Sequence, residues 1–250
     1  MSAPQRLTVR HQSVYHYWEP VRFGEHRMMF RPRASHDLRL LTAQLLITPT
    51  PERLYWLHDV FDNSVAVATF SVEASELLFR SKVTLEHYEA PLPDYSLEAY
   101  ASTWPFAYTS EEASDLVNAR SRQFPNDDVD LWARRFIDPG GTTGTMTLLR
   151  SMTLEIKNNF MYVRRVEKGV NRPADTLRLR SGSCRDFAVL MMDAVRSLGL
   201  AARFVSGYIF VPDHDTTLGG GATHAWLQIY LPGAGWVDLT RPTASSATGI

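Results

Sequence analysis

Three residues in the second half of the chain have the side-chain types of a thiol acyl-transfer site. Cys184, the only cysteine, lies in the segment RSGSCRDF at residues 180–187. His224 begins the sequence HAW, and Asp238 ends the sequence GWVD. A thiol nucleophile, a histidine base and a carboxylate that orients the base together attack carboxamides through a thioester. The sequence therefore predicts acyl transfer, with Cys184, His224 and Asp238 as catalytic candidates.

The residues around Cys184 favour a reactive thiol. A lone cysteine is more often a small buried hydrophobic residue, which is the structural alternative here. The neighbours are polar or flexible, however, and Ser183 or Ser181 is expected to cap a helix whose first turn contains the cysteine. The start of a helix favours a thiolate, and its N–H groups can stabilise an oxyanion. Gly182 would let the backbone approach a substrate closely.

His224 is expected at the accessible end of a strand over residues 223–231. Alternate residues from Ala225 to Ile229 are apolar and are expected to pack against the core. His224 lies on the opposite, mixed face, beside the glycine-rich loop 212–221. A general base needs such a position, exposed at one edge and held by a strand. The alternative is a histidine with an ordinary structural hydrogen bond.

Asp238 is expected on the next strand, where it shares a face with Trp236 and Thr240. From there it would accept a hydrogen bond from His224 and fix the tautomer of the imidazole. The alternative is a solvated carboxylate at a strand end. The residues alone leave both interpretations open.

The elements that carry these residues follow a β-rich first part. Apolar runs of strand length occupy residues 7–18, 38–47, 65–72 and 77–87. Turn residues are expected to separate them at 19–20, 32–35, 48–51 and 61–64. This spacing is typical of an antiparallel β-sandwich. Pro91 and Pro93 beside acidic residues indicate a linker, so we expect a first domain at 1–90 and a second at 91–250.

In the second domain, helices are expected first and a short antiparallel sheet after them. Helical stretches are expected over 110–124, with Ser110 as cap, over 145–160, and from Phe187 to Leu198. Strands are expected over 203–210, over 223–231, and from Trp236 onward. The predicted fold class is therefore α+β.

Composition excludes several classes of protein. The 250 residues carry a formal net charge of −1, without the excess of basic residues that is typical of nucleic-acid-binding proteins. No stretch approaches the roughly 18 apolar residues of a membrane span. One cysteine can make neither an internal disulfide nor a cysteine-based zinc site. We expect a cytoplasmic protein with a reduced thiol, without membrane association.

Four motifs together resemble the core of the bacterial transglutaminase-like proteins, which have the papain-like cysteine fold. They are CRDFA from Cys184, RFVSGY from Arg203, HAW from His224 and PGAGWV from Pro232. The β-rich first part is similar to the N-terminal region of such proteins at residues 7–17, 26–33 and 59–63. The resemblance covers nearly the whole chain. It implies Cys184 as nucleophile and His224 as general base, and it leaves the acyl acceptor open.

The C-terminal end departs from the family pattern. The family has its third catalytic residue, an aspartate, four residues after the tryptophan, where this chain has Thr240. Asp238 lies two residues earlier, about 6–7 Å along a strand, and would replace that aspartate only with local adjustment. An Ala-, Ser- and Thr-rich tail follows. We hypothesise that this tail is a frameshift product, in which case the triad is broken and the second domain is truncated.

These observations predict a cysteine-nucleophile enzyme that acts on carboxamides of peptides or proteins, by hydrolysis or by transamidation. No metal or organic cofactor is expected. The alternative is a non-catalytic interaction module that keeps the fold with a degenerate triad. A third hypothesis is that the first domain is a binding sandwich and that the second domain only supports it. The oligomeric state is left open.

Overall fold

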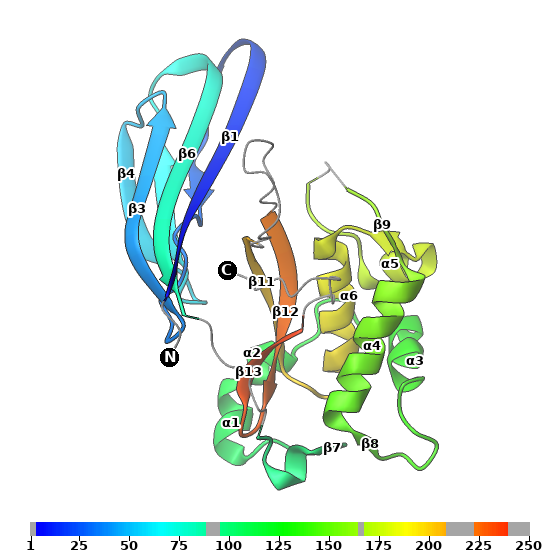
Figure 1. Ribbon diagram of the computed structural model, residues 1–250. Coiled ribbons are helices and arrows are strands. Elements are labelled where there is room, and N and C mark those ends of the chain that lie inside the picture. The colour runs from blue at the N-terminus through cyan, green and yellow to red at the C-terminus, as the bar shows by residue number, and fades with distance from the viewer. Residues whose placement is uncertain (1–3, 89–95, 165–167, 209–222, 240–250) are drawn as a thin grey trace. The chain divides into compact units, whose positions relative to one another are not determined.

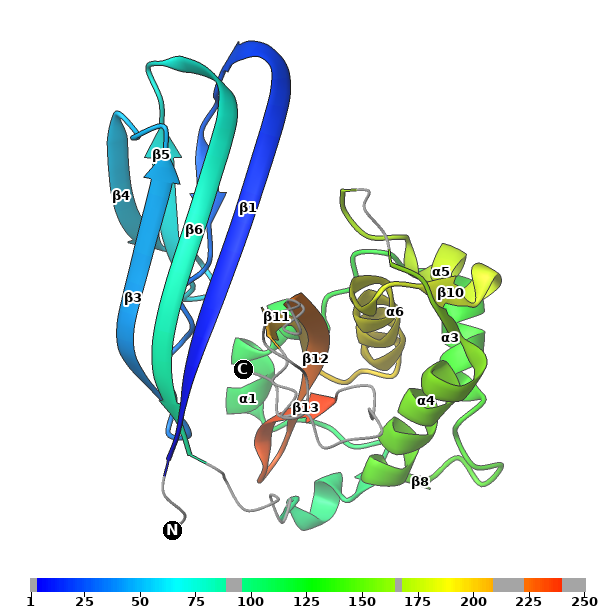
Figure 2. The ribbon, with the colours of Figure 1, turned by 45° about the horizontal axis from the view of Figure 1, so that its top comes forward.

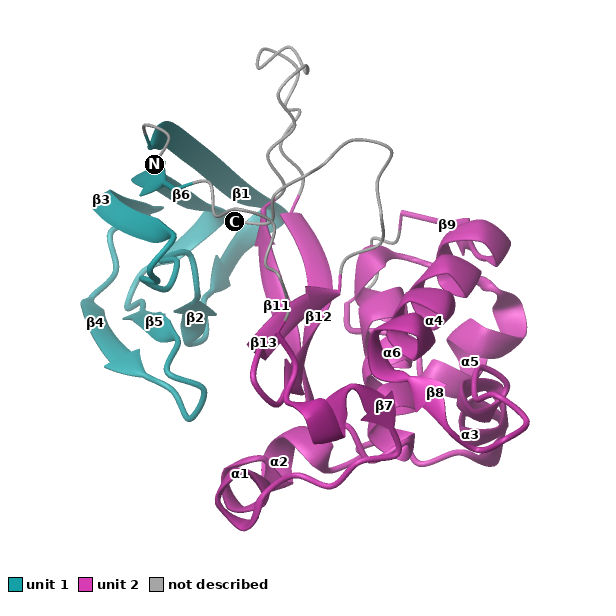
Figure 3. Ribbon diagram, turned by 60° about the horizontal axis from the view of Figure 1, so that its bottom comes forward, with its two compact units in different colours: residues 1–93 teal, residues 94–250 magenta. Residues whose placement is uncertain are grey.

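The computed structural model describes residues 4–88, 96–164, 168–208 and 223–239. The chain forms two compact units, Met1–Pro93 and Asp94–Ile250 (Figure 3). The linker expected at residues 89–94 and Thr240 lie outside the described residues.

The first unit is a sandwich of two three-stranded antiparallel sheets, β1-β6-β3 and β2-β5-β4 (Figure 1). Its strands are β1 (Gln5–Arg22), β2 (His26–Met28), β3 (Leu38–Thr48), β4 (Arg53–His58), β5 (Ser64–Thr69) and β6 (Glu73–His87). Side chains from both sheets, such as Phe79 of β6 and Ala66 of β5, form one hydrophobic core. The predicted sandwich is confirmed.

One local prediction for this unit is wrong, and two of its strands were not predicted. The turn expected at residues 19–20 does not form, because β1 continues through it with a register shift between His16 and Val21. A proline is tolerated there because β1 is an edge strand and a bulge requires no N–H donor. Strands β2 and β4 were not expected. Each is short and lies at a sheet edge, so its pairing with β5 decides its conformation.

The second unit contains the helices and a three-stranded antiparallel sheet, β11-β12-β13. The helices are η1 (Ala99–Ala101), α1 (Ser110–Asp115), α2 (Val117–Arg120), α3 (Asp127–Arg134), α4 (Thr145–Asn159), α5 (Pro173–Leu179) and α6 (Cys184–Ser197). The strands are β7 (Thr103–Trp104), β8 (Thr143–Gly144), β9 (Met161–Tyr162), β10 (Ser181–Gly182), β11 (Ala202–Tyr208), β12 (Thr223–Leu231) and β13 (Gly235–Leu239). Figures 1 and 2 show α6 between this sheet and helices α3, α4 and α5. The predicted α+β class is confirmed.

The helix boundaries follow local caps and tertiary packing. The single helix predicted over 110–124 is wrong, because the buried Leu116 separates α1 from α2. The cap is Thr109 instead of Ser110: its Oγ1 accepts from the Glu112 N–H at 3.3 Å, and the Glu112 carboxylate accepts the Thr109 N–H at 3.0 Å. Helices α3 and α5 were not expected. A signal for α3 was present in Asn126, which caps it.

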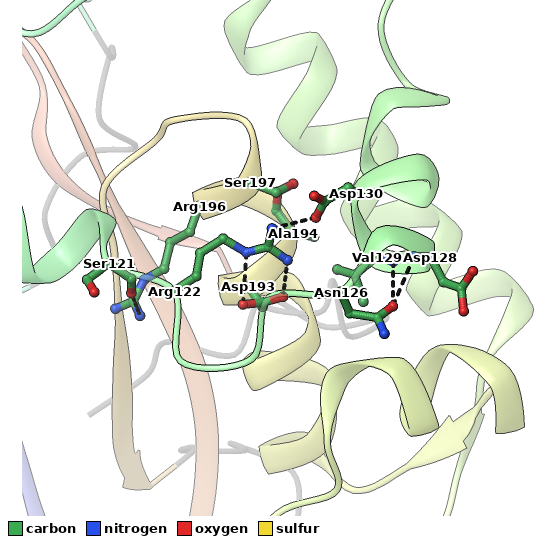
Figure 4. A network of polar contacts seen from close by, with 10 residues as sticks. All are labelled: Ser121, Arg122, Asn126, Asp128, Val129, Asp130, Asp193, Ala194, Arg196 and Ser197. Carbon is green, nitrogen blue, oxygen red and sulfur yellow. Dashed lines mark hydrogen bonds and ion pairs between the residues drawn. The ribbon is translucent and has the colours of Figure 1, made fainter.

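Helix α6 is the centre of the second unit. Ten consecutive residues, 186–195, are buried, and they include two aspartates. Asp193 is 3% exposed and accepts two hydrogen bonds from Arg122, at 3.2 and 2.7 Å (Figure 4). Arg122 also forms an ion pair with Asp130 of α3 at 2.6 Å. The hydrogen bonds to Asp193 raise the pKa of Arg122. This network fixes α3 and the segment before it to α6.

We expect Arg122→Met to lower the free energy of unfolding by about 3–5 kcal/mol, because it leaves the Asp193 carboxylate buried without its partner. Arg178→Met is the matched control. It removes an ion pair between Arg178 and Asp175, whose side chains are 69% and 50% exposed, respectively. Loss of this pair should lower the free energy of unfolding by less than about 1 kcal/mol. Urea unfolding followed by tryptophan fluorescence measures both. Equal losses in the two variants would contradict a structural role for the network.

Candidate active site

Cys184 is the first residue of α6 and is half-buried. Ser183 is the N-cap, with φ −85° and ψ 173°, whereas Ser181 belongs to β10. The predicted helix start at the cysteine is confirmed. The backbone N–H of the first helical residue has no acceptor inside the helix. Cys184 therefore presents a thiol and a backbone donor at the positive end of the helix dipole.

The chain enters α6 through a constrained turn. Arg180 ends α5 in the left-handed region, with φ 47° and ψ 35°. The next two residues pair in parallel with β9. The Met161 N–H donates to the Arg180 carbonyl at 2.8 Å, and the Val163 N–H donates to the Gly182 carbonyl at 2.9 Å. These bonds fix the backbone up to two residues before Cys184.

Asp186 completes this turn, and sequence reasoning gave it no role. Its side chain is fully buried and accepts from the Ser183 N–H and Oγ–H, both at 2.8 Å, and from the Asn171 N–H at 2.7 Å. Hydrogen bonds to a charged group contribute about 1.5–3 kcal/mol each, so several are needed to offset the burial of a carboxylate. The spacing Ser-x-x-Asp before an apolar run was the available signal.

We expect Gly182→Ala to destabilise the protein by about 1–3 kcal/mol, as overpacking does. A Cβ at this position would lie 2.8 Å from the Cβ of Asp186. Gly140→Ala is the control, because nothing lies within 4 Å of a Cβ there. Chemical unfolding of both variants checks this. Equal stability of Gly182→Ala and Gly140→Ala would contradict this prediction, because it would show that the turn accommodates the added methyl group.

His224 is the second residue of β12, and the predicted strand and face are confirmed. Ala225, Leu227 and Ile229 are buried, at 5%, 2% and 0% exposure, while His224 is half-buried on the other face. Its ring stacks on Trp226, with centroids 6.3 Å apart and planes at 20°. The rest of the strand holds the imidazole in place, as a general base requires.

The packing of α6 on β12 brings the two residues to one end of the second unit. Figures 1 and 2 show the N-terminal ends of α6 and β12 at the same end, and these ends carry Cys184 and His224.

Asp238 contacts Trp226, the next residue on the same face of β12 as His224. In the register of β12 and β13 it lies opposite Gln228, and its Oδ1 accepts from the Trp226 Nε1–H at 2.8 Å. Trp226 is its diagonal neighbour, whereas His224 is two residues further along β12. The catalytic role of Asp238 stays a prediction, and Asp238 reaches His224 through the indole of Trp226.

Two family models match the chain. The bacterial transglutaminase-like N-terminal region matches residues 7–86, and the transglutaminase-like superfamily model matches residues 132–240. The chain belongs to the transglutaminase-like superfamily. The second match includes Cys184, His224 and Asp238 and ends at Thr240.

Relatives of this transglutaminase-like chain occur in mycobacteria. An uncharacterized protein of Mycobacterium tuberculosis (strain ATCC 25618 / H37Rv) is 25% identical over 240 residues, which cover 93% of this chain and 76% of the relative. An uncharacterized protein of Mycobacterium leprae is 40% identical over 86 residues, about 30% of each chain. These matches carry no assigned activity.

A solved structure shares the fold. A candidate cysteine protease from Cytophaga hutchinsonii aligns with a TM-score of 0.68 and 19% identity, over 96% of this chain and 77% of its own. The periplasmic domain of TgpA from Pseudomonas aeruginosa aligns with a TM-score of 0.45 and 17% identity, over 95% of this chain and 76% of its own.

In the described ranges of the present chain, no helix is long and apolar enough to cross a membrane. The cytoplasmic location stays a prediction.

Proposed function

We propose that this protein transfers acyl groups from carboxamides of peptides or proteins through a thioester on Cys184. The observation that carries the proposal is the position of the only cysteine at the first residue of a buried helix. A thiol there lies beside a backbone N–H that has no partner within the helix. His224, at the same end of the unit, supplies the base.

In the first half of the proposed reaction, His224 takes the proton of the Cys184 thiol, and Sγ attacks the carbonyl carbon of the substrate. The Cys184 N–H stabilises the oxyanion that forms. The carbon–nitrogen bond then breaks, and His224 returns the proton to the leaving amine. The products of this half are a free amine and the thioester.

In the second half, water or a primary amine attacks the thioester, and His224 takes a proton from the attacking group. The carbon–sulfur bond breaks, and the proton passes to the Cys184 sulfur. Water yields a carboxylic acid and an amine yields a new amide. The proposal invokes no metal or organic cofactor, because each step only moves protons and an acyl group. We retain the cytoplasmic location as part of the proposal, since one cysteine allows no internal disulfide.

A second candidate function is a non-catalytic interaction module. The sequence at position 240 favours it, because Thr240 stands where the family has its catalytic aspartate. The Asp238 carboxylate, two residues earlier, accepts from the Trp226 indole. Reactivity of Cys184 separates the two functions, since a module needs none.

We expect the wild type to convert the side-chain amide of a glutamine-containing peptide, and Cys184→Ala to abolish that conversion. Mass spectrometry with and without a primary amine distinguishes the acid from the new amide. His224→Asn should slow turnover by about 10²–10⁴-fold, the usual contribution of a general base. The matched control is His16→Asn, an exposed histidine of the first unit that pairs with Glu76.

The native protein should also react with iodoacetamide faster than the urea-unfolded chain, because only the fold brings the helix end and His224 to the thiol. Loss of labelling in Cys184→Ala alone would be trivial in a chain with one cysteine. Turnover that persists in Cys184→Ala would overturn the mechanism. Equal native and unfolded alkylation rates, without turnover, would favour the interaction module.

We expect Asp238→Asn to reduce turnover by about tenfold or less, because the amide oxygen can still accept from the Trp226 indole. Asp238→Leu should reduce turnover further, because it leaves the Trp226 indole N–H without its acceptor. A carboxylate that oriented His224 directly would behave differently: its amide replacement costs on the order of 10⁴ in turnover. A loss of that size in Asp238→Asn, measured as kcat on the same peptide, would assign Asp238 as a direct partner of His224.

A further inference from the structure

The proposed reaction leaves one buried charged residue near Cys184 without a role. Asp186 is the third residue of α6 and is fully buried. Asp193, seven residues later on the same helix, is bonded to Arg122 and belongs to the core network. Asp186 instead accepts from backbone and hydroxyl donors of the segments that lead to the nucleophile.

The two carboxylate oxygens of Asp186 hold two different segments. Oδ2 accepts from the Ser183 N–H and from the Ser183 Oγ–H, both at 2.8 Å. Oδ1 accepts from the Asn171 N–H at 2.7 Å, across fifteen residues of sequence. One side chain therefore joins the residue before the nucleophile to the segment that precedes α5.

The turn also packs directly on this carboxylate. A Cβ on Gly182 would lie 2.8 Å from Cβ and 3.2 Å from Oδ2 of Asp186, so only glycine fits here without displacement. On its other side, the Gly182 carbonyl is bonded to the Val163 N–H at 2.9 Å. The backbone of residues 182–183 is thus held from both sides, immediately before Cys184.

We infer that Asp186 is the positioning residue of the nucleophile, an inference that rests on the proposed function. By fixing Ser183, it sets the direction in which Cys184 presents its Sγ and its backbone N–H. Those two groups must meet the carbonyl carbon and the carbonyl oxygen of one substrate amide at the same time. Asp186 acts through the backbone and does not touch the substrate.

A simple helix cap would act differently. Loss of a cap lowers stability and leaves the chemistry of the folded molecules unchanged. Loss of a positioning residue lowers the rate of the folded molecules as well, since a displacement of about 1 Å in a catalytic group can cost on the order of 10²-fold.

The test compares Asp186→Asn with Asp193→Asn. Both replace a buried, hydrogen-bonded carboxylate of α6, but Asp193 lies about 10 Å further along the helix at 1.5 Å per residue. Each variant is assayed where circular dichroism shows it folded. We expect Asp186→Asn to lower kcat on the glutamine peptide by about 10²-fold with KM little changed. Asp193→Asn should keep the kcat of the wild type, even if it unfolds more easily.

Ser183→Ala keeps the inference falsifiable if Asp186→Asn does not fold. It removes the Ser183 Oγ–H donor and should lower kcat by a smaller factor at unchanged KM. A folded Asp186→Asn or Ser183→Ala with wild-type kcat overturns the inference and leaves the proposed function standing. So does an equal loss of kcat in Asp193→Asn. A wild type without turnover overturns the proposed function first, and the inference with it.

Discussion

The burial of helix α6 is the constraint on which the second unit depends. A helix that is buried over residues 186–195 leaves no water for its polar side chains, and it contains two aspartates. Each must therefore be matched inside the protein. Asp193 is matched by Arg122, and this fixes α3 and the segment before it. Asp186 is matched by donors at the start of the helix, and this fixes the turn that carries Cys184. The same requirement thus stabilises the core and shapes the site.

The sheet contributes the second half of the site through its register. Because β12 packs on α6 with its apolar face, His224 is held at one end of the strand with its ring stacked on Trp226. The pairing of β12 with β13 places Asp238 diagonal to Trp226. The described partner of this carboxylate is therefore an indole, and the indole ring stacks on the imidazole of His224.

Local patterns predicted much of this arrangement. The helix that begins at Cys184, the strand of His224 and the sandwich of the first unit all follow from periodicity and turn residues, because those signals depend on neighbours in sequence. The edge strand β4 and the break at Leu116 did not follow, because pairing and packing with distant segments decide them. Asn126 and the Ser-x-x-Asp spacing were readable signals for α3 and for Asp186.

By itself, the sequence determined the types of group available for catalysis and their order: one thiol, a histidine on a later strand and an aspartate two residues short of the family position. Only the tertiary structure decided their partners. It placed Asp238 on Trp226, and it gave Asp186 three donors from two segments. Spacing along one strand is a local property of the chain. The bonds from Asn171 to Asp186 and from Arg122 to Asp193 depend on contacts between residues far apart in sequence, and no local pattern encodes them.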